Sequence, residues 1–486
     1  MAPQVTEPAL ATSTSSPFAP TSTPLPVARA EGDILSEQQK QRLDAAALRY
    51  VAEDEASAVQ VARSLGYIKN DGHPASVCGP LAIAILRDAG LLSKYIDLHA
   101  FWLLDPRDSL NMRTLERAFP GDEFLWYKTR ESIADFDFEA FPLKAGDFLY
   151  LYAGDPGSFE HMLTVSRVDQ GGQAFAVTNF NTPQGYVIRE VLLYDPQHPG
   201  EGKFYDWTDR RNSHYGLTGF GGFDLWRFQV PVTDPTPSEV ALADEIDQVI
   251  ARYGGQWYVL LKEAGGKIHY SRRIRDAIHP ASIIKVPIAM LFMKSLESQR
   301  IVDYQAALMG GFGGRSYAQL LKAMLVDSEE NATETLLEDL ERKRFDIAGA
   351  LQAWKADSTD VRQRISSARD LAVVFDGLYG DFLLAQPRQI LLGLLKVYTP
   401  GDDTRLGVIR KLIPEGYNFY NKRGTITDEF LTVSDCALVE MPTSSGKRMF
   451  VAGAYSFHGQ SQVTYEDLVK AMETMARMFV EYAMQL

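Results

Sequence analysis

A proline- and threonine-rich segment near the middle of the chain, QVPVTDPTPSE at 229–239, limits how the 486 residues can fold. Proline lacks the amide proton that a helix interior or a central strand needs, so such a segment separates folding units. A chain of this length also exceeds what one hydrophobic core usually serves. We therefore expect two domains, at 33–230 and 239–486, joined by a linker at 231–238.

Residues 1–32 are rich in Pro, Ser, Thr and Ala and cannot bury enough apolar surface to fold, so we expect a disordered spacer. We interpret this spacer as the segment that follows a signal peptide or membrane anchor not present in this chain. That interpretation predicts an extracytoplasmic location, either secreted or attached to the cell surface. No stretch of the sequence is long and apolar enough to be a transmembrane segment.

The composition excludes several classes of function. A net charge of −14 argues against a nucleic-acid partner, which requires a basic face. The two cysteines, Cys78 and Cys436, fall in different expected domains, so we predict neither a disulfide nor a thiolate metal site. The eight histidines show no ligand spacing, and we predict no metal and no cofactor. Cys436 lies in an apolar strand pattern and is expected to be buried packing.

The letters HPAS occur twice, at 73–76 and 279–282, and each copy leads into an apolar stretch with helical spacing. The two halves differ in the order of their expected elements, so the match does not indicate a duplication. In the second copy Ser282 is followed three residues later by Lys285, and such positions share one face of a helix. A partly desolvated amine can take a serine proton, so the pair predicts a nucleophile and its base.

Two more elements follow in order: SEEN, with Ser328 and Glu330 at an expected helix break, and KRGT, which begins an expected strand at Lys422. Together with S-x-x-K they resemble the S-x-x-K, S-D-N and K-T-G elements of class A β-lactamases and penicillin-binding proteins. The resemblance covers the second domain. It implies an α+β fold in the order hairpin, nucleophile helix, helical subdomain, K-x-G strand, antiparallel strands and terminal helix. It also implies that Ser282 is the acylated nucleophile and Lys285 its base.

The same resemblance implies roles for the other elements. Ser328 is expected to pass a proton to the leaving group, and Lys422 to hold both Ser328 and a substrate carboxylate. Gly424 and Thr425 are expected to present the strand edge to the substrate backbone. The backbone amides of Ser282 and Thr425 are expected to form the oxyanion hole.

One departure from the family concerns Glu330, which stands at a substrate-binding position where the family has Asn. We expect this carboxylate to pair with Lys285 or Lys422 and to weaken the lysine as a base. Moving the alignment by one residue places Asn331 at the Asn position, but it then puts Glu329 at the serine position, which is a poorer match.

A second departure is a missing glutamate. In class A β-lactamases a Glu between the second and third elements activates the water that hydrolyses the acyl-enzyme. Here no Glu occurs between Glu341 and Glu415, and the nearby carboxylates are Asp357 and Asp360. We therefore do not expect an efficient β-lactamase. A slow transpeptidase, carboxypeptidase or esterase is compatible with the absence, and so is an inactive relative.

In the first domain, Cys78 begins a CGP segment at the expected start of an apolar helix, where the helix dipole favours a thiolate. His161, at the start of an expected strand, is the candidate base. Asn179 in the next strand is the candidate for orienting its ring, and Asn181 on the same face is the alternative. These elements, in this order, resemble papain-like cysteine peptidases of the bacteriocin-processing type and related cell-wall amidases. The resemblance implies helices with an antiparallel sheet.

The first domain also departs from its family, which has a Gln before the Cys that helps to form the oxyanion hole. The preceding stretch YIKNDGHPAS has no Gln, although Asn70 or His73 can be considered as substitutes. The alternative is that Cys78 is a small buried hydrophobe and His161 an ordinary structural histidine.

Taken together, these patterns predict a bacterial two-domain α+β hydrolase that acts by acyl transfer, through a cysteine in the first domain and a Ser-Lys pair in the second. Peptides, peptidoglycan and β-lactams are the expected partners. Two alternatives remain open. One is a β-lactamase or a serine esterase, and the other is a non-catalytic surface binding protein built on degenerate hydrolase domains.

Overall fold

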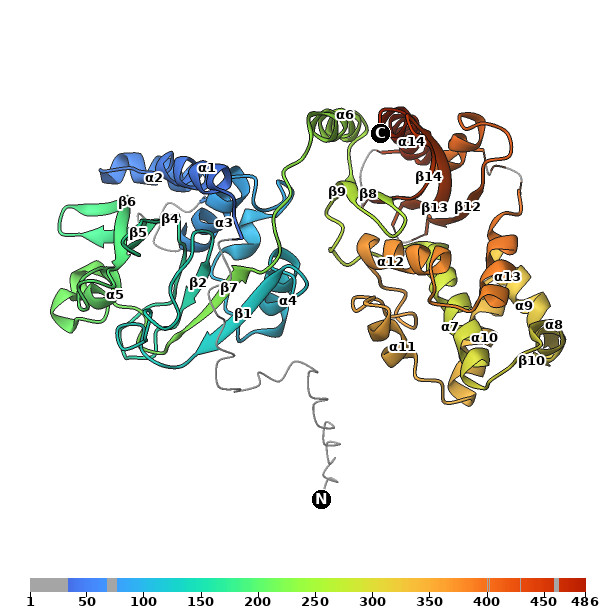
Figure 1. Ribbon diagram of the computed structural model, residues 1–486, viewed down its shortest axis with the longest axis horizontal. Helices are drawn as coiled ribbons and strands as arrows, with labels where there is room; N and C mark the ends of the chain where they lie inside the picture. The colour runs from blue at the N-terminus through green and yellow to red at the C-terminus, as the bar shows by residue number, and fades with distance from the viewer. Residues whose placement is uncertain (1–33, 68–76, 400, 402, 429, 459–462) are drawn as a thin grey trace, which may run out of the picture. The chain divides into compact units, whose positions relative to one another are not determined.

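The computed structural model describes residues 34–67, 77–399, 401, 403–428, 430–458 and 463–486 (Figure 1). The contacts within the chain divide it into two compact units, Met1–Thr233 and Asp234–Leu486. The division falls inside the proline-rich segment that the sequence marks as a boundary. In the described ranges, the helices all lack the combination of length and apolarity that crossing a bilayer requires.

The first unit combines helices with antiparallel sheets. One sheet has the strand order β1-β7-β2-β3, and the other has the order β4-β5-β6. The helices are α1 (Glu37–Leu48), α2 (Glu55–Ser64), α3 (Cys78–Asp88), η2 (Leu98–Phe101), α4 (Ser109–Ala118), α5 (Lys203–Asp206) and η3 (Arg210–Tyr215). The strands are β1 (Phe124–Thr129), β2 (Phe148–Leu151), β3 (His161–Thr164), β4 (Arg167–Val168), β5 (Ala174–Thr182), β6 (Gly185–Tyr194) and β7 (Phe223–Phe228).

Helix α3 is the buried centre of this unit, which explains why its sequence CGPLAIAIL is apolar on every side. It lies against η2 and β3, and Gly79 permits this close approach. A Cβ atom at Gly79 would lie 2.2 Å from the carbonyl oxygen of Phe101 and 2.8 Å from Cε of Met162. The start of α3 is therefore enclosed by neighbouring chain segments.

The second unit is a five-stranded antiparallel sheet, of order β12-β13-β14-β8-β9, between two layers of helices. Its helices are α6 (Pro237–Tyr253), η4 (Ala281–Ile284), α7 (Lys285–Ser298), α8 (Tyr304–Met309), α9 (Tyr317–Leu325), α10 (Glu330–Arg342), α11 (Ile347–Ala353), α12 (Ala368–Tyr379), α13 (Ala385–Leu395), η5 (Arg405–Lys411) and α14 (Tyr465–Ala483). Its strands are β8 (Gln256–Glu263), β9 (Ile268–Arg272), β10 (Gly311–Phe312), β11 (Arg315–Ser316), β12 (Phe419–Ile426), β13 (Thr432–Thr443) and β14 (Gly446–Phe457).

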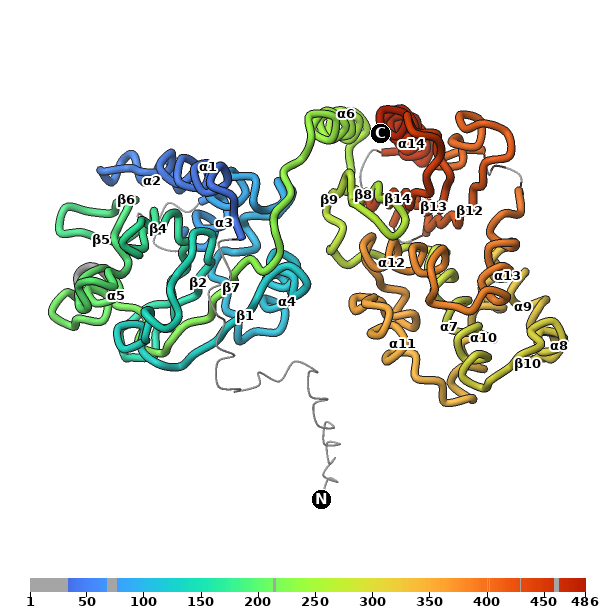
Figure 2. The backbone as a smooth tube through the Cα atoms, viewed as in Figure 1, coloured from blue at the N-terminus to red at the C-terminus, as the bar shows by residue number. Residues whose placement is uncertain are grey.

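The chain path of the second unit confirms the element order expected from the sequence. The backbone leaves the β8–β9 hairpin, passes through the helices α7 to α13 and returns to the sheet at β12 (Figure 2). Helices α6 and α14 cover one face of the sheet, and the helical subdomain packs on the other. Cys436 is buried in β13, as expected.

Both ends of the second unit meet at one buried carboxylate. Helix α6 begins with a capping box in which Thr236 and Glu239 satisfy each other's backbone N–H groups. The Glu239 carboxylate also pairs with Lys267 at 2.7 Å, and it lies 3.2 Å from Nδ1 of His269 on β9. The hydroxyl of Tyr482, near the end of α14, lies 2.9 Å from the same His269 nitrogen and 3.5 Å from Glu239. The first turn of α6 is thus tied to β9 and to α14.

The main chain of β12 lies directly against η4, and Gly424 makes this possible. A Cβ atom at Gly424 would lie 2.6 Å from Oγ of Ser434 and 2.8 Å from both the Cβ of Ala281 and the carbonyl oxygen of Pro280. The Ser434 hydroxyl donates to that carbonyl oxygen at 3.0 Å. This contact fixes the strand carrying Lys422 beside the turn that carries the HPAS serine.

We expect a Gly424→Ala variant to be less stable by about 1–3 kcal/mol, because the added methyl group must push β12 away from η4. Thermal unfolding measures the loss. Gly393→Ala is the matched control, since Gly393 is exposed on α13 and a Cβ there meets nothing within 4 Å. Equal melting temperatures for the two variants would show that the close approach does not constrain the fold.

Candidate functional site

Ser282 and Lys285 lie where two short elements join. Ser282 is in the 3₁₀ helix η4, and Lys285 is the first residue of α7. Both residues are helical, as their spacing predicts. The Lys285 side chain is only 1% exposed, whereas Ser282 is half-buried. The arrangement therefore places an enclosed amine one helical turn away from a half-buried serine.

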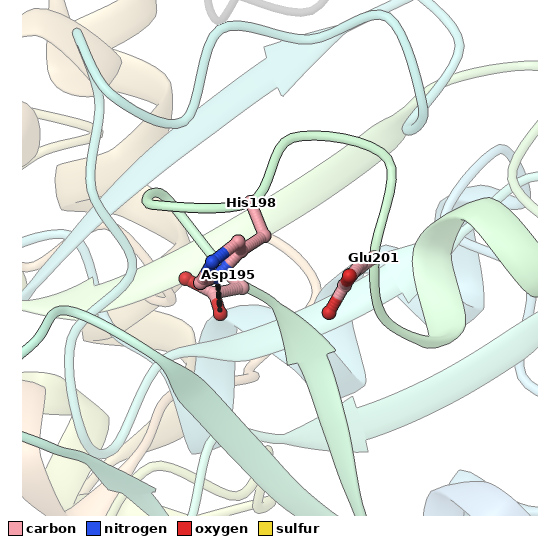
Figure 3. A group of neighbouring side chains, drawn as sticks. All are labelled: Asp195, His198 and Glu201. Atoms are coloured by element: carbon pink, nitrogen blue, oxygen red, sulfur yellow. Dashed lines mark hydrogen bonds and ion pairs between the residues drawn. The ribbon is translucent and has the colours of Figure 1, made fainter.

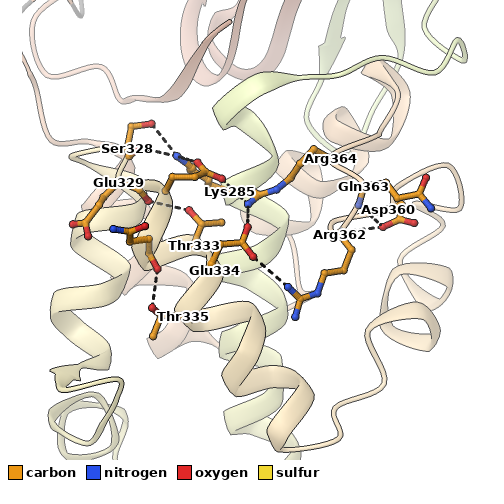
Figure 4. Close-up of polar contacts among 12 residues, drawn as sticks. Lys285, Ser328, Glu329, Thr333, Glu334, Thr335, Asp360, Arg362, Gln363 and Arg364 are labelled. Atoms are coloured by element: carbon orange, nitrogen blue, oxygen red, sulfur yellow. Dashed lines mark hydrogen bonds and ion pairs between the residues drawn. The ribbon is translucent and has the colours of Figure 1, made fainter. Parts of the chain in front are cut away.

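The Lys285 amine binds the segment between α9 and α10. Its Nζ donates to the carbonyl oxygen of Ser328 at 2.7 Å and to Oγ of Ser328 at 3.5 Å (Figure 4). The same Ser328 Oγ accepts a hydrogen bond of 2.9 Å from Nζ of Lys422 on β12. Three of the residues singled out by their motifs are thus brought together, with one hydroxyl between two amines. Ser328 itself adopts a left-handed φ of 59°, which is rare for a residue other than glycine.

Glu330 pairs with Lys285 at 2.8 Å, so the first of the two pairings left open by the sequence is confirmed. Its second oxygen pairs with Arg364 at 2.6 Å. Burial acts to raise the pKa of Glu330, but the hydrogen bond and charge of Lys285 and the charge of Arg364 outweigh it, and the net shift is downward. The carboxylate is therefore ionised at neutral pH and bridges two cations.

A buried arginine holds the far side of β12. Arg405, 3% exposed and with a left-handed φ of 56°, donates to the carbonyl oxygens of Gly424 at 2.9 Å and Ser434 at 3.0 Å. Its other terminal nitrogen donates to Oγ1 of Thr425 at 2.6 Å and to the hydroxyl of Tyr465 at 2.9 Å. Arg405 could not be predicted from the sequence, because nothing in the surrounding segment DDTRLG indicates a buried arginine.

The loop between α11 and α12 contains no glutamate but has two aspartates. Asp357 and Asp360 are exposed. The Asp360 carboxylate accepts the backbone N–H groups of Arg362 and Gln363 at 2.9 Å each, so it stabilises its own turn. The side chain that this loop directs to the site is that of Arg364 (Figure 4).

In the first unit, the surroundings of Cys78 do not support the expectation of a thiolate. Cys78 does begin α3, as predicted, but its side chain is buried. Burial raises the pKa of the thiol to about 11, and the opposing backbone hydrogen bonds near Met162 and Gly79 are smaller effects. The favourable field of the helix start is therefore outweighed by the loss of solvent around the sulfur.

His161 begins β3, but its partners differ from those expected. Nε2 of His161 lies 2.8 Å from Oγ1 of Thr178, and the ring packs edge-on against Trp207 at 5.2 Å between centroids. Burial lowers the pKa of His161 to about 4, so the ring is neutral at pH 7. The partner is Thr178 rather than Asn179 because side chains alternate along β5, which leaves Asn179 and Asn181 on the other face.

The same alternation separates His161 from Cys78. On β3, Met162 packs in the core cluster that contains Cys78, whereas Leu163 belongs to the cluster on the other face. His161 shares the face of Leu163. The side chain of His161 therefore lies on the face of β3 that is opposite the cluster containing Cys78. Asn70 and His73, considered as oxyanion-hole residues, lie outside the described residues.

Within the part of the chain that the structure describes, one group of side chains has the composition of a metal site, namely Asp195, His198 and Glu201 (Figure 3). Its buried member is already satisfied. Oδ2 of Asp195 is bonded to Nε2 of Gln173 at 2.6 Å and to Nδ1 of His198 at 2.9 Å, and Oδ1 accepts from the backbone of Gln197 at 2.8 Å. The His198 bond lowers the pKa of Asp195 to about 2, so the pair stabilises a surface turn. We assign this group no ligand.

We expect Cys78 to react with iodoacetamide at pH 7 roughly a hundredfold more slowly than a free thiol, because burial leaves so little thiolate. The measurement uses a Cys436→Ser variant, in which Cys78 is the single cysteine, with N-acetylcysteine as the reference. A rate equal to or faster than the reference would contradict the buried-thiol interpretation and restore the nucleophile.

Comparison with known proteins concerns the second unit. Residues 241–483 match the model of the beta-lactamase enzyme family. An ancestral class A β-lactamase is similar in structure, with a TM-score of 0.40 and 22% identity over 49% of this chain and 99% of that chain. A β-lactamase from Chitinophaga pinensis has a TM-score of 0.40 and 15% identity over 49% of this chain and 98% of that one. No curated protein matches the chain.

Proposed function

Because the chain belongs to the beta-lactamase enzyme family through residues 241–483, we propose that its second unit is a serine hydrolase or acyltransferase with Ser282 as the nucleophile. The observation that carries the proposal is the environment of Ser328, whose hydroxyl is bonded to Lys422 at 2.9 Å and to Lys285 at 3.5 Å. A hydroxyl between two amines can relay a proton between the attacking group and the leaving group.

The proposed reaction is acyl transfer. Oγ of Ser282 attacks the carbonyl carbon of an amide or ester, and its proton moves to the amine of Lys285. The bond from the carbonyl carbon to the leaving nitrogen or oxygen then breaks, and the Ser328 hydroxyl gives that atom a proton. Ser328 regains its proton from Lys285, which completes the balance. The backbone amides of Ser282 and Thr425 are the proposed oxyanion hole.

The loop between α11 and α12 supports a long-lived acyl-enzyme. Release of the acyl group by water needs a base, and Asp360 is engaged by its own turn while Arg364 occupies the site. A penicillin-binding activity of the transpeptidase or carboxypeptidase type therefore fits better than an efficient β-lactamase. Peptidoglycan peptides are the substrate class that we propose, which accords with an extracytoplasmic location.

The first unit supports a catalytic role less well. The start of α3 directs backbone N–H groups at the Cys78 sulfur, which a thiol hydrolase requires. However, the thiol is buried, and His161 lies on the other face of β3. For the described part of this unit, buried packing at Cys78 accounts better for the geometry than the papain-like cysteine peptidase or amidase activity.

We expect incubation with a penicillin to add the mass of the intact antibiotic to the protein and the adduct to persist for many minutes. The adduct should be absent in Ser282→Ala, because the acylated oxygen is removed. Intact mass spectrometry makes the measurement. Ser298→Ala, at the exposed far end of α7, is the control that should acylate normally.

Each other outcome identifies an alternative. Rapid disappearance of the adduct with product release would point to a β-lactamase. The absence of any adduct in the folded wild-type protein would contradict the proposed acyl transfer and favour a non-catalytic binding protein. An adduct that remains in Ser282→Ala would show that a different residue is acylated.

A further inference from the structure

Glu330 is shared by two cations that come from different elements. Its carboxylate oxygens contact Nζ of Lys285, on α7, at 2.8 Å and a terminal nitrogen of Arg364, on the loop between α11 and α12, at 2.6 Å. The same nitrogen of Arg364 also contacts Glu334, one turn further along α10. The Arg364 side chain is only 14% exposed, whereas that of Glu330 is 61% exposed. The arginine is thus the more enclosed member of this pair.

The position of Arg364 is fixed from both sides by backbone hydrogen bonds. The loop closes between Asp360 and Ile365, which exchange bonds of 2.8 and 3.0 Å. The next residue, Ser366, exchanges bonds of 2.8 and 3.0 Å with Ile278, just before the HPAS segment. Arg364 itself has a left-handed φ of 58°, a conformation that costs an arginine about 1 kcal/mol. The surrounding contacts therefore hold the backbone of Arg364 in a conformation that an arginine rarely adopts, and they keep its side chain at the site.

Four charged or titratable groups govern the surroundings of the Lys285 amine. The negative charge of Glu330 on α10 favours a positive charge at this amine. The positive charges of Lys422 on β12, which is linked to it through Ser328, and of Arg364 on the loop disfavour one. The fourth group, His279, precedes η4. Burial lowers its pKa, and Arg364 acts in the same direction, so the ring is mainly neutral at pH 7. The electrostatic environment of the Lys285 amine is therefore set by one carboxylate and two cations.

We propose that Arg364 is a positioning residue that tunes Lys285 as a base by sharing the carboxylate of Glu330. The inference rests on the proposed acylation of Ser282. While Arg364 occupies one carboxylate oxygen, Glu330 binds the Lys285 amine less strongly, and this favours transfer of the Ser282 proton to that amine. Without Arg364, Glu330 is left to Lys285 alone and stabilises its charged form.

The test is the second-order rate of acylation by a penicillin as a function of pH. In Arg364→Ala we expect the rising part of the profile to move about one pH unit upward and the rate at pH 7 to fall about tenfold. Arg364→Lys keeps the charge and should restore most of the rate. Arg362→Ala is the matched control, because Arg362 pairs with Glu334 and Glu341 on the same helix without contacting Glu330, and its profile should not move.

A double variant separates tuning through Glu330 from a general effect on the fold. Glu330→Gln should move the profile to lower pH, and adding Arg364→Ala to it should cause little further shift. The proposal is overturned if Arg364→Ala leaves the profile unchanged or shifts it equally in the Glu330→Gln background. If Arg364→Ala does not fold, Arg364→Gln, which keeps most of the side-chain volume, replaces it in both backgrounds.

The two proposals fail in different ways. A folded wild-type protein that no penicillin acylates would overturn the proposed function, and the role of Arg364 with it. A wild type that is acylated normally while Arg364→Ala keeps the same pH profile would overturn the positioning role alone. Thermal unfolding of each variant confirms that the rates are compared between folded proteins.

Discussion

The buried amino group of Lys285 is the constraint on which the second unit depends. Removing a polar or charged group from water is costly unless neighbouring groups replace its hydration. The replacements come from Ser328, in the turn that joins α9 and α10, and from Glu330 in the first turn of α10. A second buried amine, that of Lys422, bonds the same serine. Polar contacts around these two amines therefore hold together the nucleophile helix, the α9–α10 turn and strand β12.

Part of the site in the second unit could be predicted from the sequence. Helical spacing places Lys285 one turn after Ser282. The resemblance puts Glu330 where the family has Asn, and from this an ion pair with Lys285 or Lys422 was expected; the pair with Lys285 forms. Arg364 and Arg405 could not be predicted, because no periodic pattern in the sequence relates them to the motifs. Both have left-handed backbone conformations that tertiary contacts impose, and local sequence rules do not foresee such conformations.

In the first unit, a correct local prediction led to a chemical expectation that the geometry does not support. The helix start at Cys78 and the strand start at His161 both lie where the sequence placed them. The apolar run CGPLAIAIL already indicated a helix enclosed on all sides, and that enclosure raises the pKa of the thiol. The face on which His161 lies depends on strand pairing, which cannot be read from the order of elements alone.

The cluster around Glu239 has a consequence for how the second unit could be reconnected. The capping box of α6 and the last turns of α14 meet at the same carboxylate, through His269 and Tyr482. The two helices lie side by side (Figure 1). The beginning and the end of this unit are therefore neighbours in space. A short peptide bridge could join them, and the chain could be opened at the exposed β13–β14 hairpin turn instead. A circular permutant of this kind would leave Ser282, Lys285 and their partners on an unbroken segment.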